Sequence, residues 1–195
     1  DDGRIFRCLK EFYSLPPEWV REIADKFLDY FRPHKQKVIK FYYDRSGNNY
    51  GRSKQSMALQ MKEAIEKDGT GAKTGWRVQL MSLGQGNIPM ADEYIFMREL
   101  MSGHNPLLPE LQIDAIHCRH LKAALELAKT TVDSMKRVGK DKSAEKSSDP
   151  KRLVESTNFT DAFKYALMRK TWADIVKRGT TSDLPGGAVG DVSVR

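Results

Sequence analysis

The sequence contains few cysteines, no long apolar run and no zinc-binding pattern. Cys8 and Cys118 are its only cysteines, and they lie far apart, outside any CxxC pair and without a histidine at ligand spacing, which argues against a zinc site. We expect both to be reduced thiols in the protein core. No apolar run approaches the roughly 20 residues that a membrane span needs, and no charged and then apolar leader opens the chain. We therefore expect a soluble, intracellular protein without a membrane partner.

Positive charge is in excess. The 195 residues include 33 Lys and Arg against 26 Asp and Glu, giving a net charge of +7 and a pI near 9.3. Lys and Arg side chains gain affinity for polyanions by releasing the counterions condensed on phosphates. The charge therefore favours a nucleic-acid partner, with solubility alone as the alternative explanation.

Strand and helix patterns alternate along the chain. The strand patterns cover 3–12, 37–43, 76–83 and 111–116, and the helical patterns cover 17–33, 56–67, 90–101, 118–132 and 159–176. In the third helix the expected buried side is formed by Tyr94, Met97, Leu100 and Met101. The polar stretch 136–151 is expected to be a mobile loop. This order predicts one α/β domain over residues 1–178, with an open sheet between helices, followed by a disordered tail over 179–195.

Two carboxylates occupy positions where chemistry is common in such a sheet. Asp44 follows the 37–43 strand directly, and Asp161 lies in the first turn of the last helix. Carboxylates from a strand end and from a neighbouring helix can converge on a divalent cation, since Mg²⁺ prefers oxygen ligands. The alternative is structural: Asp44 starts a turn, and Asp161 interacts with the helix dipole.

Three segments carry a resemblance to a known family: KVIKFYYDRSGNNYG from Lys37, LLPELQIDAIHCRHLKAALELA from Leu107, and STNFTDAFKYAL from Ser156. Their order and spacing resemble the nuclease domain of large terminase subunits, the DNA-packaging proteins of tailed bacteriophages and prophages. The resemblance covers roughly 3–172. It implies a ribonuclease-H-like mixed sheet flanked by helices. It also implies a metal-dependent endonuclease activity that cuts concatemeric double-stranded DNA during packaging.

The resemblance also implies site residues and partners. Asp44 and Asp161 match acids that hold two Mg²⁺ or Mn²⁺ ions, and the implied partners are DNA, the terminase ATPase domain, the small terminase subunit and the portal. The location would be the cytoplasm of the bacterial host. The family's first metal-binding Asp lies in an opening strand that precedes the 3–12 strand. Asp1 and Asp2 match that position poorly, so we expect this chain by itself to cleave DNA weakly or not at all.

Other polar residues have weaker claims to a role in DNA binding or catalysis. Asp114 and Glu93 are further candidates for the acidic cluster. The basic loop could contact DNA through Lys136, Arg137, Lys140 and Lys142, or it could be a solvated charge run. The histidines have no ligand spacing and are expected at surface or capping positions, namely His34, His104, His117 and His120. Trp19, Trp76 and Trp172 are expected in the core rather than as base-stacking platforms.

Two other readings remain open. The chain could be a non-catalytic DNA-binding or motor-docking module, as the absent first Asp would permit. It could also be a different ribonuclease-H-like nuclease, such as a junction resolvase. The polar loop and the long spacer between Asp44 and Asp161 favour the terminase reading.

Overall fold

The structure is a computed structural model, and it describes residues 5–14, 20–44, 55–82, 90–127, 130–132, 138–140 and 158–168. The chain divides into two compact units. One consists of Asp1–Phe6, Ile88–Gln112 and Met168–Arg195, and the other of Arg7–Asn87 and Ile113–Leu167. Asp44 and Asp161 both belong to the second unit.

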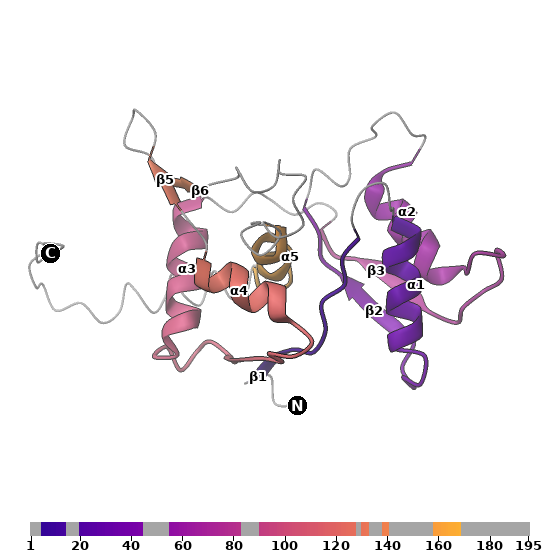
Figure 1. The fold of residues 1–195 in the computed structure, drawn as a ribbon, viewed down its shortest axis with the longest axis horizontal. Helices are drawn as coiled ribbons and strands as arrows, with labels where there is room; N and C mark the ends of the chain where they lie inside the picture. The colour runs from indigo at the N-terminus through magenta and orange to yellow at the C-terminus, as the bar shows by residue number, and fades with distance from the viewer. Residues whose placement is uncertain are drawn as a thin grey trace, which may run out of the picture. The chain divides into compact units, whose positions relative to one another are not determined.

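Helices and strands alternate, which confirms the α/β class (Figure 1). The elements are β1 Ile5–Cys8, α1 Val20–Tyr30, β2 Val38–Phe41, α2 Met57–Glu66, β3 Arg77–Leu80, α3 Met90–Ser102, β4 Glu110–Ile113, α4 Arg119–Leu127, β5 Thr130–Val132, β6 Val138–Lys140 and α5 Asn158–Leu167. Within the described residues the strands form separate two-stranded sheets, β1–β4, β2–β3 and β5–β6, rather than one continuous sheet. The β2–β3 pair is parallel and the β5–β6 pair antiparallel.

The β2–β3 pair buries one face under α1 and α2, which Figure 1 shows beside it. Ile39 pairs with Val78, and Phe41 pairs with Leu80. Because side chains alternate between the two faces of a strand, these four residues share a face. Apolar residues of the two helices pack on that face, with Ala24, Ile65, Trp76 and Val78 buried at the centre of the cluster. The predicted core position of Trp76 is confirmed.

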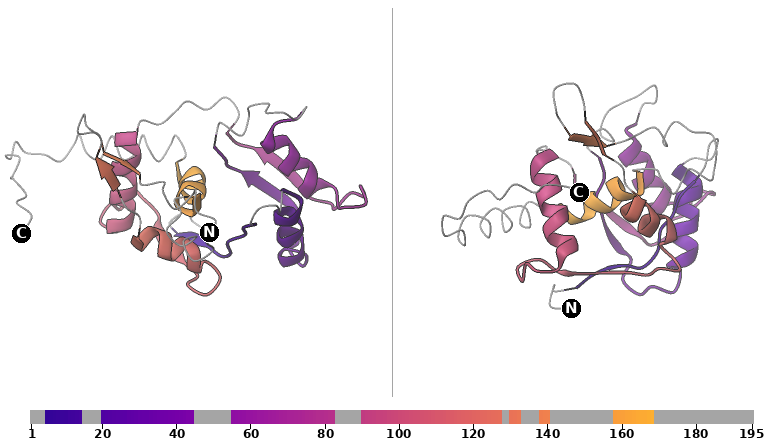
Figure 2. Two further views of the ribbon diagram at one scale, coloured as in Figure 1. Left: turned by 45° about the horizontal axis from the view of Figure 1, so that its top comes forward. Right: turned by 60° about the vertical axis from the view of Figure 1, so that its left-hand side comes forward.

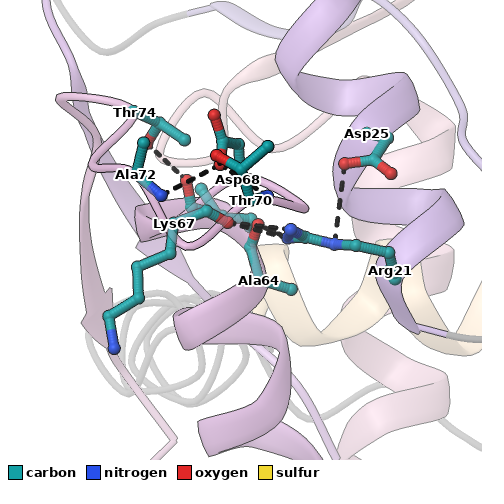
Figure 3. A network of polar contacts seen from close by, with 9 residues as sticks. Arg21, Asp25, Ala64, Lys67, Asp68, Thr70, Ala72 and Thr74 are labelled. Atoms are coloured by element: carbon teal, nitrogen blue, oxygen red, sulfur yellow. Dashed lines mark hydrogen bonds and ion pairs between the residues drawn. The ribbon is translucent and has the colours of Figure 1, made fainter.

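A polar network fixes how α2 ends and how the chain turns towards β3 (Figure 3). The Arg21 guanidinium on α1 donates to the carbonyl oxygens of Ala64 and Lys67, with distances of 2.8 and 2.9 Å to Lys67. A cation at the carboxyl end of a helix is favourable because the last carbonyls lack intrahelical partners. Beyond the helix, the Asp68 carboxylate accepts a hydrogen bond from the Thr70 backbone N–H at 2.8 Å. The chain therefore turns directly after this helix.

Side chains of α2 close the outer edge of β3. The ladder bond from the Arg77 N–H to the Lys37 carbonyl points towards β2, so the polar groups of Val78 point the other way. The Val78 N–H donates to Glu66 Oε1 at 2.9 Å, and Lys62 Nζ donates to the Val78 carbonyl oxygen at 2.9 Å. Both outward polar groups of Val78 are thus satisfied by side chains, and no strand among the described residues pairs with this edge of β3.

Several predicted elements differ from the structure at their ends. The strand predicted over 3–12 covers Ile5–Cys8, and the helix predicted over 159–176 ends at Leu167. The helix predicted over 118–132 stops at Leu127, and Thr130–Val132 forms β5 instead. The β-branched residues Thr130, Thr131 and Val132 favour extended backbone, which explains the change. The predicted mobile loop contains β6, which pairs with β5. Lys140 is therefore a strand residue, and this prediction was wrong for Val138–Lys140.

The buried face of α3 was predicted correctly only in part, with Leu100 buried as expected. Phe96 and Leu100 are buried, whereas Tyr94 is 61% and Met101 52% exposed. Phe96 and Leu100 are four residues apart and define the inward side, and Tyr94 lies about 200° around the helix from Phe96. The prediction placed two apolar residues on the wrong side because α3 carries apolar residues around most of its circumference.

Several predictions concern residues outside the described part of the chain. They include the tail over 179–195, Trp19, Trp172, Asp1, Asp2, Lys136, Arg137 and Lys142. None of the helices in the described ranges is both long enough and apolar enough to span a membrane.

Candidate functional site

Asp44 lies at the carboxyl end of the parallel β2–β3 pair, as predicted. The Met81 N–H donates to the Phe41 carbonyl at 2.9 Å, and the Tyr43 N–H donates to the buried Ser82 hydroxyl at 3.0 Å. These bonds hold the segment between the last β2 residue and Asp44 against the end of β3. Since ligands of α/β sheets bind at the carboxyl ends of strands, Asp44 occupies a position suited to a site.

Asp161 lies in the first turn of α5, also as predicted. Its side chain is 17% exposed, and Oδ1 lies 2.8 Å from Nζ of Lys164, whose side chain is 7% exposed. The interaction joins residues three apart on one helix, a spacing that places side chains next to each other. The Asp161 carboxylate is thus largely withdrawn from solvent and paired with a buried ammonium.

A hydrogen bond links α5 to the end of β2. The Tyr165 hydroxyl donates to Oδ2 of Asp44 at 3.1 Å. Tyr165 is four residues after Asp161, so it lies one helical turn along the same side of α5. Asp44 is therefore held next to the helix that carries Asp161. We expect the two carboxylates to lie within about 8 Å of each other, since the ions of a two-metal site lie close together between their ligands.

The donor chemistry of this arrangement fits a hard divalent cation. Carboxylate oxygens are the ligands that Mg²⁺ and Mn²⁺ prefer, and Mg²⁺ keeps several waters, so two protein ligands suffice to begin a site. Within the described ranges, no group of three His, Cys, Asp or Glu side chains is arranged to share a metal ion.

Asp114, a further candidate acid, has a structural role. Its Oδ1 accepts the backbone N–H groups of Ile116 and His117 at 2.9 Å each, and its Oδ2 lies 2.8 Å from Nδ1 of His117. The His117 hydrogen bonds lower the pKa of Asp114 to about 2. This carboxylate organises the turn before α4, and its hydrogen bonds explain its position without a bound ligand. Glu93 lies on α3, in the other unit.

A buried Glu–His pair was missed by the sequence analysis. The Glu11 carboxylate accepts hydrogen bonds from the His120 backbone N–H at 3.1 Å and the Leu121 N–H at 2.9 Å, and lies 2.5 Å from His120 Nδ1. The His120 ring stacks on Phe159 with centroids 5.3 Å apart. The predicted surface or capping position is therefore wrong for His120, which is 8% exposed. Nothing local could have indicated this, because its partner Glu11 lies 109 residues away in sequence.

The His120–Phe159 stack joins α4 to the first turn of α5. These two helices lie side by side, and both views in Figure 2 show them together. Tyr13 completes the cluster, with its ring centroid 4.8 Å from that of His120. Phe159 is two residues before Asp161, so this cluster helps to fix where the first turn of α5 lies.

Both cysteines are free thiols, as expected. Cys118 is buried, and its Sγ lies 3.5 Å from the Cys8 carbonyl oxygen. Burial, together with the nearby Cys118, raises the pKa of Cys8 to about 12, and burial also raises the pKa of Cys118. Because the thiolate is the reactive form, the raised pKa values lower the reactivity of both thiols near neutral pH.

Of the four basic residues predicted to contact DNA, only Lys140 lies in the described part of the chain, at the end of β6.

Comparisons with protein-family models, with curated proteins and with solved structures find no match to this chain.

Proposed function

We propose that this chain is the nuclease domain of a large terminase subunit, a metal-dependent endonuclease that cuts concatemeric double-stranded DNA during genome packaging in the cytoplasm of a bacterial host. The observation that carries the proposal is the hydrogen bond of 3.1 Å from Tyr165 to Asp44. It connects the two segments in which the terminase resemblance places acidic ligands. The alternation of helices and strands is compatible with the ribonuclease-H-like sheet that this function requires.

In this proposal Asp44 and Asp161 bind Mg²⁺ or Mn²⁺, together with a further acidic ligand. When bound, such ions would supply an activated water and charge stabilisation for the leaving oxygen of a phosphodiester. Tyr165 restricts the rotamer of Asp44 by donating to one of its oxygens, and the Tyr13–His120–Phe159 cluster holds the first turn of α5. The chain's own contribution is therefore the placement of two carboxylates.

DNA binding is proposed to depend on the backbone phosphates. The net charge of +7 favours a polyanion, and phosphate contacts carry little sequence information. Neutralising the basic residues of the 136–142 segment together should weaken duplex binding if that segment contacts DNA. The residues to change are Lys136, Arg137, Lys140 and Lys142. Unchanged affinity would leave the segment as a solvated charge run.

The decisive experiment measures cation binding and cleavage in the same variants. Asp44→Asn and Asp161→Asn should each weaken Mn²⁺ binding by about tenfold or more, since each removes a charged oxygen ligand. Any Mn²⁺-dependent nicking of plasmid DNA should be lost with them. Asp29→Asn is the matched control, because Asp29 is an exposed acid on α1 paired with Arg32.

The outcomes separate the candidate functions. Mn²⁺ binding that depends on both acids supports the nuclease. If all three variants bind Mn²⁺ like the unaltered chain, the assigned site is wrong. Duplex binding without any effect of either acid would favour a non-catalytic DNA-binding or motor-docking module.

A further inference from the structure

The helix α5 carries a lysine on its buried face. Thr160, Phe163, Lys164 and Leu167 are all buried, and their spacing of three and four residues makes them one stripe of the helix. An ammonium in such a stripe is unusual, because lysines are almost never fully buried unless they are paired. The ion pair of 2.8 Å with Asp161 meets that requirement.

Stability alone does not explain the choice of lysine at this position. Withdrawing an ammonium and a carboxylate from water is costly, and replacing a buried ion pair with apolar residues of similar volume is often neutral or stabilising. A methionine would fill the stripe beside Phe163 and Leu167 at no cost in desolvated charge. The ion pair therefore points to a role for the positive charge beside Asp161.

That role follows from the position of Asp161. The carboxylate that Lys164 contacts is the one assigned to a divalent cation, and its helix is linked to Asp44 through Tyr165. A cation approaching Asp161 meets a positive charge at short range, in a place where both side chains are mostly shielded from solvent. Screening is weak for such partly buried charges, so the repulsion is substantial.

We propose that Lys164 is a positioning residue that regulates this site: it fixes the orientation of Asp161 and lowers the site's affinity for divalent cations. The inference rests on the proposed function, because it assumes that Asp161 is a cation ligand. Lys164 does not touch the substrate in this proposal. It acts through the Asp161 carboxylate that it contacts.

The test is the affinity of the 195-residue chain for Mn²⁺ alone, measured from the electron paramagnetic resonance signal of the free ion. Lys164→Met removes the charge and keeps an apolar side chain of similar length, and it should tighten Mn²⁺ binding by about tenfold. Lys164→Arg keeps the charge and should leave the affinity within about twofold of the unaltered chain. A residue that only supported the fold would weaken binding when replaced, so the direction of the change is diagnostic.

Two further variants provide a control and an alternative to Lys164→Met. Lys122→Met removes an exposed lysine of α4 that pairs with Glu126 at 3.7 Å, and it should not change Mn²⁺ affinity. Lys164→Gln retains a hydrogen-bond donor for Asp161 without the charge, so it tests the same idea if Lys164→Met does not fold. Circular dichroism establishes folding in each case.

The outcomes distinguish this inference from the proposed function. The role of Lys164 is refuted if the folded Lys164→Met and Lys164→Gln variants bind Mn²⁺ as the unaltered chain does, or more weakly. The metal site still stands in that case, provided that Asp161→Asn loses Mn²⁺ binding. If neither the unaltered chain nor these variants bind Mn²⁺, the metal site is itself refuted. The inference is supported if Mn²⁺ binds more tightly when the Lys164 charge is removed but not when the Lys122 charge is removed.

Discussion

Replacing Glu11 should destabilise the chain substantially. Its carboxylate accepts two backbone N–H groups from the first turn of α4 and lies 2.5 Å from His120 Nδ1. Losing a side-chain cap at a helix start costs about 0.5–2 kcal/mol. Leaving a buried donor such as the His120 ring N–H without its partner costs about 1–3 kcal/mol. Glu11→Ala should therefore lower the free energy of unfolding by about 3 kcal/mol.

The assay is urea unfolding followed by circular dichroism, where the midpoint and slope give the free energy of unfolding. Glu11→Gln keeps an accepting oxygen and should lose less than Glu11→Ala. Glu126→Ala is the control, because Glu126 is an exposed carboxylate of the same helix, 62% accessible, and should change stability by no more than about 0.5 kcal/mol. If Glu11→Ala unfolds at the same urea concentration as the unaltered chain, the assigned capping role is refuted.

Three further predictions concern titration, thiol chemistry and DNA binding. Hydrogen bonds from His117 lower the pKa of Asp114 to about 2, so its contribution to stability is present above about pH 4 and is lost as the pH falls towards 2. Asp114→Asn should flatten stability against pH in that range, and an unchanged slope would contradict this assignment. Burial raises the pKa of Cys8 to about 12, so near pH 8 a thiol reagent should label it slowly unless the chain unfolds; labelling of the folded chain at the rate of a free cysteine would be the contrary result. Affinity for duplex DNA should fall at least tenfold between about 50 and 200 mM salt with little dependence on sequence, and equal affinity at both concentrations would rule out binding dominated by phosphates.

Local signals were sufficient to place the two candidate ligands along the chain. Asp44 follows a short β-branched and aromatic run, and Asp161 follows residues that commonly begin helices. Both signals depend only on neighbouring residues, and both positions are found as predicted. The hydrogen bond that connects Asp44 to Tyr165 spans 121 residues, so no local pattern could have indicated it.

The errors arise where tertiary contacts override local patterns. His120 was expected at a surface or capping position because the histidines show no ligand spacing, but a distant carboxylate and two aromatic rings enclose it. No prediction was made for Lys164, although its spacing from Phe163 and Leu167 placed it on the inward stripe. Periodicity identifies the buried side of a helix more reliably than residue type when a charged residue has a partner nearby.

The closed edge of β3 has a consequence for self-association. Open edges of apolar strands invite pairing with strands of other molecules, and proteins protect them with charged side chains. The Lys62–Glu66 ion pair of α2, 2.5 Å apart, binds both outward polar groups of Val78 in β3. A second molecule therefore finds no template for edge-to-edge growth at Val78.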